Sequence, residues 1–180
     1  MSLWICAVLV CAGEPEVAMS LEGAIVHRPA HFTHRQAFLD LPETVVLLAD
    51  VPADPAKLAA AFARVASDDG EQPGMKLPAS MVATGPVLDG PDQVLPRRLV
   101  RRGNRLELEI LHTAVRLQGV QLRRNIIWRP MVEVPLELPP GLYQLDVTWR
   151  AVAGLPDGKP LDAPPLIRSV KFAIEPGKRP

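Results

Sequence analysis

Arginine is concentrated in one part of the chain, where it could bind anionic groups. From Arg97 to Arg129 there are nine arginines and two glutamates, whereas the stretch from Glu14 to Gln93 holds five bases and twelve acids. Guanidinium groups bind carboxylates, sulfates and phosphates through paired N–H donors. The segment predicts either a docking strip for an anionic polysaccharide or an acidic protein surface, or internal pairing with the acidic half. The candidate binding residues are Arg97, Arg98, Arg101, Arg102, Arg105 and Trp128.

Arginines occupy both faces of the segment 97–102, which is expected to be a strand. A central strand could not bury that many charges, so we expect this strand at the edge of a sheet. Trp128 is either a recognition aromatic on a loop or a core residue. No aromatic residue lies among the arginines from Arg97 to Arg124, which disfavours nucleic acid as the partner.

Three histidines, His27, His31 and His34, fall within eight residues and are the candidate metal ligands. If their loop folded back, the imidazoles could bind Zn, Cu or Ni, with Asp40 or Met19 as a further ligand. The alternative is a polar loop before a helix cap, which needs no metal. Pro29 favours that alternative, because it would break a helix that placed His27 and His31 on one face.

No motif of an enzyme is recognisable in the chain. A serine in a nucleophile elbow, a glycine-rich phosphate loop and the HExxH pattern are all missing from the sequence. We therefore expect a non-enzymatic domain that binds or braces another macromolecule. The alternatives are a periplasmic metal-binding protein that uses the histidines, and an enzyme whose site no motif reveals.

The first 13 residues have the features of a signal peptide. The apolar run from residue 3 to residue 12 is too short to span a bilayer, and Cys11 and Gly13 would supply small residues before a cut at Glu14. We expect export to the periplasm or the extracellular space. No basic residue precedes the run, so a start codon placed too late or a first strand are alternatives. Cys6 and Cys11 are the only cysteines, so the mature chain would have no disulfide framework.

The elements that must position these residues are mainly β. Twenty prolines favour loops and short strands over long helices. We expect one sandwich domain over residues 14–180, irregular from 14 to 93 and regular from 94 to 175. Asp54 as N-cap and Pro55 predict one short helix that ends near Gly70, and a single helical turn is expected at 34–39. The apolar run 44–49 predicts a buried central strand.

Alternating apolar and polar residues predict a series of antiparallel strands in the second half. A hairpin over 99–102 and 105–111 is expected to turn at Gly103 and Asn104. Further strands are predicted at 115–117, 120–122, 132–138, 143–149 and 170–174.

The run VEVPLELPPGLYQLDVTW, residues 132–149, resembles the tyrosine corner of immunoglobulin-like and fibronectin type III-like sandwiches, with Gly141 and Tyr143 at the corner positions. The resemblance implies that the Tyr143 hydroxyl donates a hydrogen bond to nearby backbone. The paired cysteines of immunoglobulin domains are absent from the run, so only the architecture is implied. A shared β-sandwich architecture does not indicate a shared function.

Overall fold

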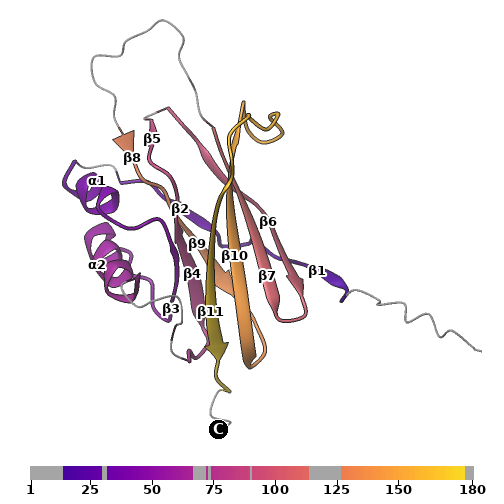
Figure 1. Cartoon of the computed structure of the whole chain (residues 1–180). Coiled ribbons are helices and arrows are strands. Elements are labelled where there is room, and N and C mark those ends of the chain that lie inside the picture. Colours follow the sequence, from indigo (N-terminus) through magenta and orange to yellow (C-terminus); the bar gives the residue numbers. More distant parts are fainter. Residues whose placement is uncertain are drawn as a thin grey trace, which may run out of the picture.

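The computed structural model describes residues 14–29, 32–66, 72, 74–89, 91–113 and 127–176. They form a mainly β structure in three layers (Figure 1). Two helices cover one face of a four-stranded sheet, and a five-stranded sheet packs on its other face. The predicted fold class is therefore confirmed, with several antiparallel sheets and a second helix in addition to the expected one.

The five-stranded sheet has the order β1-β6-β7-β10-β11. Its neighbouring strands pair antiparallel except for β7 and β10, which pair parallel. The strands are β1 (Glu16–Met19), β6 (Val94–Arg102), β7 (Arg105–Thr113), β10 (Gly141–Val152) and β11 (Leu166–Ile174).

The four-stranded sheet is antiparallel and has the order β2-β9-β4-β3. Its strands are β2 (Ile25–His27), β9 (Met131–Leu136), β4 (Ala79–Thr84) and β3 (Val45–Leu48). Two shorter strands, β5 (Leu88–Asp89) and β8 (Ile127–Trp128), pair with each other at one end of the molecule.

The main core lies between the two sheets and follows the alternation of the sequence. On β7 the side chains of Leu106, Leu108 and Ile110 are buried, whereas Glu107 and Glu109 face outward. The facing sheet contributes the same pattern from β9, with Val132, Val134 and Leu136 inward. Each such side chain gains about 1.5–3 kcal/mol when it leaves water, so the pattern fixes which face of each strand is inside.

A second core joins the helices to the outer face of the four-stranded sheet. Helix α2 (Pro55–Ala66) is capped by Asp54, whose Oδ1 accepts a hydrogen bond from the Lys57 amide at 2.9 Å. The predicted start of this helix is thus confirmed. Helix α1 (Phe32–Leu39) is longer than the single turn expected at 34–39. The buried apolar residues of this layer are Phe38, Leu41, Val46, Leu48, Leu58, Ala59, Phe62, Val82 and Met131.

Strand β3 is buried, as its apolar run predicts, but it is not central. It pairs only with β4 and forms the edge of its sheet, so the predicted position is wrong. The strand is nevertheless buried at all four residues because α2 covers its outer face and the other sheet its inner face. Gln72 Oε1 also accepts a hydrogen bond from the Leu47 amide at 2.7 Å, which satisfies a donor on this edge.

Tyr143 forms the hydrogen bond that the resemblance implies. The Tyr143 hydroxyl donates to the Pro139 carbonyl at 2.8 Å, and the ring stacks on Phe172. The two sheets are compatible with a β-sandwich. The parallel pairing of β7 with β10 nevertheless differs from the antiparallel sheets of immunoglobulin domains.

The hairpin between β6 and β7 is confirmed, with Arg102 opposite Arg105. Its turn residue Gly103 has a φ of +56°, in the left-handed region that glycine adopts without strain. The predicted signal peptide 1–13, the strands 115–117 and 120–122 and the expected helix end near residue 70 lie outside the described residues, and export stays a prediction.

Candidate functional site

The outer face of the five-stranded sheet carries its charged side chains in rows across the strands. The strand register places Arg102 opposite Arg105, Arg105 beside Gln144, and Gln144 opposite Lys171. Residues that are partners in the register share one face of the sheet. These residues therefore form one row across β6, β7, β10 and β11, which is about 15 Å long at the usual strand spacing. We call it the basic row; its members are Arg102, Arg105, Gln144 and Lys171.

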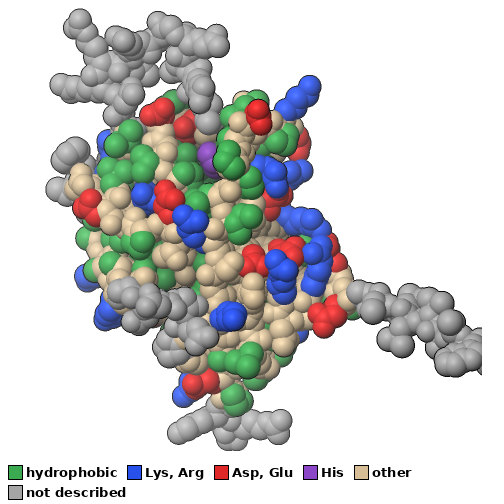
Figure 2. Space-filling view, viewed as in Figure 1, with side chains coloured by type: hydrophobic (Ala, Val, Ile, Leu, Met, Phe, Trp, Pro, Cys, Tyr) green, Lys and Arg blue, Asp and Glu red, His purple; other side chains and the backbone are tan. Residues whose placement is uncertain are grey.

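An acidic row lies next to the basic row on the same face. It consists of Glu107, Asp146 and Ser169, which are partners in the register of β7, β10 and β11. Arg102 Nη1 lies 3.0 Å from Glu107 Oε1, and Arg105 Nε lies 2.6 Å from Asp146 Oδ2. Figure 2 shows the resulting mixture of blue and red side chains on this side of the molecule. Most of the arginine charge in this region is thus balanced locally.

Glu16 on β1 extends the ion pairs to the edge of the sheet. Its carboxylate binds Arg98 and Arg102, and hydrogen bonds from Arg102 and Arg98 lower the pKa of Glu16. These side chains are exposed to solvent, where water screens an ion pair and it adds little to stability. These ion pairs therefore fix the positions of surface side chains more than they stabilise the fold.

Asp146 belongs to the acidic row, contacts the basic row and is buried, with 7% of its surface exposed. Its Oδ1 accepts hydrogen bonds from Ser169 Oγ at 2.5 Å and Gln144 Nε2 at 3.1 Å, and its Oδ2 accepts one from Arg105 Nε. Burial alone would raise the pKa of Asp146, but the bonds from Ser169, Gln144 and Arg105 together outweigh it, so the pKa is lowered. Asp146 is therefore ionised at neutral pH.

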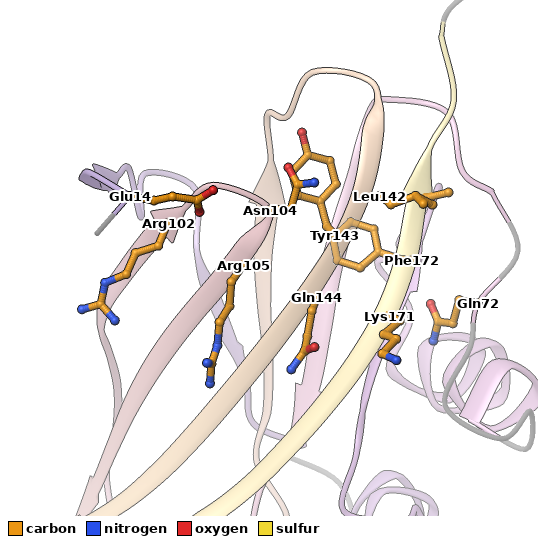
Figure 3. A pocket seen from close by; sticks show the side chains of 11 residues that line it. Glu14, Gln72, Arg102, Asn104, Arg105, Leu142, Tyr143, Gln144, Lys171 and Phe172 are labelled. Atoms are coloured by element: carbon orange, nitrogen blue, oxygen red, sulfur yellow. The ribbon is translucent and has the colours of Figure 1, made fainter. Parts of the chain in front are cut away.

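The basic row lines an open hollow of about 680 Å³ at the end of the sheet (Figure 3). Arg102, Arg105, Gln144 and Lys171 follow one another across the strands in this view. Leu142 also lines the hollow and is 73% exposed, the largest exposed fraction among the large apolar residues that the structure describes. The hollow thus combines three cations and one carboxylate, that of Glu14, with an apolar contact surface.

Lys171 differs from the arginines in its surroundings. Within the described ranges its ammonium group has no hydrogen-bond or ion-pair partner. Arg105 uses Nε for Asp146, so its two terminal Nη groups are left for another acceptor. An ammonium and a guanidinium in one hollow are the groups that would hold a carboxylate, sulfate or phosphate.

The structure separates the arginines that the sequence analysis grouped together. Arg102 and Arg105 line the hollow, whereas Arg98 binds Glu16 and Arg97 lies 3.9 Å from Glu109. Arg101 lies at the end of the inner face, where its guanidinium is 5.5 Å from the centre of the Tyr143 ring.

The predicted edge position of the strand over 97–102 is wrong for residues 99–102, because β1 pairs with them and is itself the edge. The prediction failed because Arg98 and Arg102 project from the outer face. A further strand can pair with this backbone without burying their charges.

Trp128 lies away from the hollow and is a buried residue of β8. Its Nε1 donates a hydrogen bond to the Asp89 carbonyl at 3.0 Å, and the Arg28 guanidinium stacks over its ring at 4.7 Å. These contacts agree with the core interpretation of this tryptophan.

The structure places two of the three candidate metal ligands, His27 and His34. His27 Nε2 lies 2.9 Å from Glu133 Oε2, His34 belongs to α1, and His31 lies outside the described residues. Among the residues that are described, no group of three His, Cys, Asp or Glu side chains has the arrangement of a metal site. The metal hypothesis, which depends on His31, stays a prediction.

Sequence reasoning missed Lys171 and Leu142 and did not assign a role to Asp146. The alternation of β10 does place Gln144 and Asp146 on the outer face. What the pattern could not show is that β10 lies between β7 and β11, because strand order is a long-range property.

Comparison of the chain with protein-family models, with curated protein sequences and with solved structures finds no match. In the parts of the chain that the structure describes, no helix is long and apolar enough to cross a membrane.

Proposed function

We propose that this chain is a non-enzymatic docking domain that binds an acidic segment of another protein at the basic row. The observation that carries the proposal is the hollow lined by Arg102, Arg105 and Lys171, in which Lys171 has no partner within the described residues. A partner carboxylate would add an ion pair there without first breaking one. The likeness to immunoglobulin-like domains stays part of the proposal and does not identify the partner.

A protein fits the hollow better than a polysaccharide or a nucleic acid. Leu142 gives the hollow an exposed apolar side chain beside its cations, and protein interfaces combine an apolar centre with a charged rim. Every aromatic side chain that the structure describes is buried, so this part of the chain has no stacking platform for bases or sugar rings. Local acids also balance the arginines, which weakens attraction to a simple polyanion.

The test is binding of poly-L-glutamate by the wild-type chain and by Lys171→Met. We expect wild-type binding to weaken as salt rises, because the contact is an exposed ion pair. Lys171→Met should weaken binding about 3- to 10-fold, which corresponds to about 0.7–1.4 kcal/mol. Isothermal titration calorimetry or surface plasmon resonance measures both values.

Lys57→Met is the matched control, because it removes the same charge from the exposed side of α2. Its affinity should stay within about twofold of the wild type, since Lys57 does not line the hollow and salt screens exposed charges that do not touch the ligand. No binding by the wild type, or an equal loss in both variants, would refute the proposal. Tighter binding of alginate, a polysaccharide with carboxylates, would refute the choice of a protein partner.

A further inference from the structure

The hollow presents a fixed arrangement of donors and acceptors as well as positive charge. Asp146 accepts hydrogen bonds from the side chains of Arg105 and Gln144 and so fixes their orientation. Ser169 in turn donates a hydrogen bond to Asp146. Asp146 itself is almost completely buried, so its carboxylate oxygens are held in a fixed position by these three hydrogen bonds. Arg105 and Gln144 are thus oriented before a ligand arrives.

The orientation of the Gln144 amide follows from the charge of Asp146. An ionised carboxylate can only accept hydrogen bonds, so Gln144 must turn its NH₂ group toward Asp146. The Gln144 carbonyl oxygen is then directed away from Asp146 and is left to accept a hydrogen bond. The basic row therefore offers donors at Arg105 and Lys171 and an acceptor at Gln144, between them in the register.

We propose, on the basis of the function proposed above, that the hollow recognises a carboxylate with an N–H donor beside it, as in an extended acidic peptide. The carboxylate binds the Nη groups of Arg105 and the Lys171 ammonium, and a peptide N–H donates to Gln144 Oε1. An extended peptide suits this arrangement, because its backbone is not hydrogen-bonded internally and its N–H groups are free. Asp146 acts as a positioning residue that does not touch the ligand.

Two polymers separate this inference from attraction by charge alone. Poly-L-glutamate has carboxylates and backbone N–H groups, whereas polyacrylate has carboxylates at higher density and no N–H group. If charge alone governs binding, polyacrylate binds at least as tightly per carboxylate. We expect the wild-type chain to bind poly-L-glutamate about 5-fold more tightly per carboxylate, the value of roughly one added hydrogen bond.

Gln144→Met tests whether the preference comes from Gln144. The substitution keeps the length of the side chain and removes its acceptor, so the preference for poly-L-glutamate should disappear while polyacrylate binding stays unchanged. Gln36→Met is the matched control, because Gln36 also donates to an aspartate, Asp40, but on α1. It should leave both affinities unchanged, and thermal denaturation checks that each variant is folded.

Equal binding of the two polymers by the wild type, or tighter binding of polyacrylate, would overturn the inference and leave the docking function standing. Binding of neither polymer would overturn both. The wild-type comparison decides the matter even if Gln144→Met fails to fold. A preference that persists in folded Gln144→Met would show that the acceptor is not Gln144.

Discussion

Replacing Phe62 by alanine is expected to lower the free energy of unfolding by about 3–5 kcal/mol. Phe62 has no exposed surface and belongs to the core between the helices and the four-stranded sheet. Its removal would leave a cavity in the cluster that also contains Phe38 and Val82, and the helices and strands of this cluster relax only partially around a cavity. Chemical denaturation, followed by far-UV circular dichroism, measures the loss.

Lys57→Ala on the same helix is the control for this prediction. Lys57 is exposed, so its removal should change the free energy of unfolding by less than about 0.5 kcal/mol. If Phe62→Ala costs less than about 1 kcal/mol, the helices are not a structural layer of the domain, and the three-layer description is wrong.

The double variant Arg105→Glu, Lys171→Glu is expected to abolish binding of poly-L-glutamate, with a loss of affinity of at least about 100-fold. Each substitution removes a cation from the hollow and adds a carboxylate that repels the ligand. The carboxylate introduced at position 105 would also face Asp146 and Glu107, which lie 2.6 and 3.6 Å from Arg105 Nε in the wild type, so the orientation of the row would be lost as well. Titration calorimetry of the folded variant measures the effect.

The matched control is Arg150→Glu, Lys57→Glu, which changes the net charge by the same amount. Arg150 is also on the outer face of the sheet and also binds an acid through Nε, in this case Glu109 at 3.3 Å. We expect this pair of substitutions to weaken binding by less than about 5-fold, because neither residue lines the hollow. An equal loss in the two double variants would mean that binding depends on overall charge and not on the row.

Local patterns predicted the parts of the fold that depend on neighbouring residues. The alternation of β7, β9 and β10 showed which side chains face the core, and Gly103 with Asn104 marked the hairpin turn. These features follow from backbone geometry and from which face leaves water, and both are encoded within a few residues.

The order of the strands could not be predicted in the same way. The apolar run of β3 indicated burial, but an edge strand covered by a helix and a second sheet is as buried as a central one. The parallel pairing of β7 with β10 joins segments about forty residues apart, and no local signal specifies it. Such pairings depend on the whole core.

The candidate site was predicted only in part for the same reason. Arg102 and Arg105 were identified from the density of arginine, whereas Lys171 is one lysine in a strand near the end of the chain. Its place beside Gln144 follows from the register of β10 and β11. The acid that orients the row, Asp146, likewise became visible only through its contacts with Arg105 and Ser169.

The most direct test of the docking proposal is an NMR titration of the ¹⁵N-labelled chain with poly-L-glutamate. We expect the largest changes in amide chemical shift at the end of the sheet where the basic row lies, in residues 102–105, 142–146 and 169–172. Amides of α2 and of the pair His27 and Glu133 should change little, because they lie on other elements away from the hollow. Changes centred on those elements, or no changes at all, would contradict the proposal.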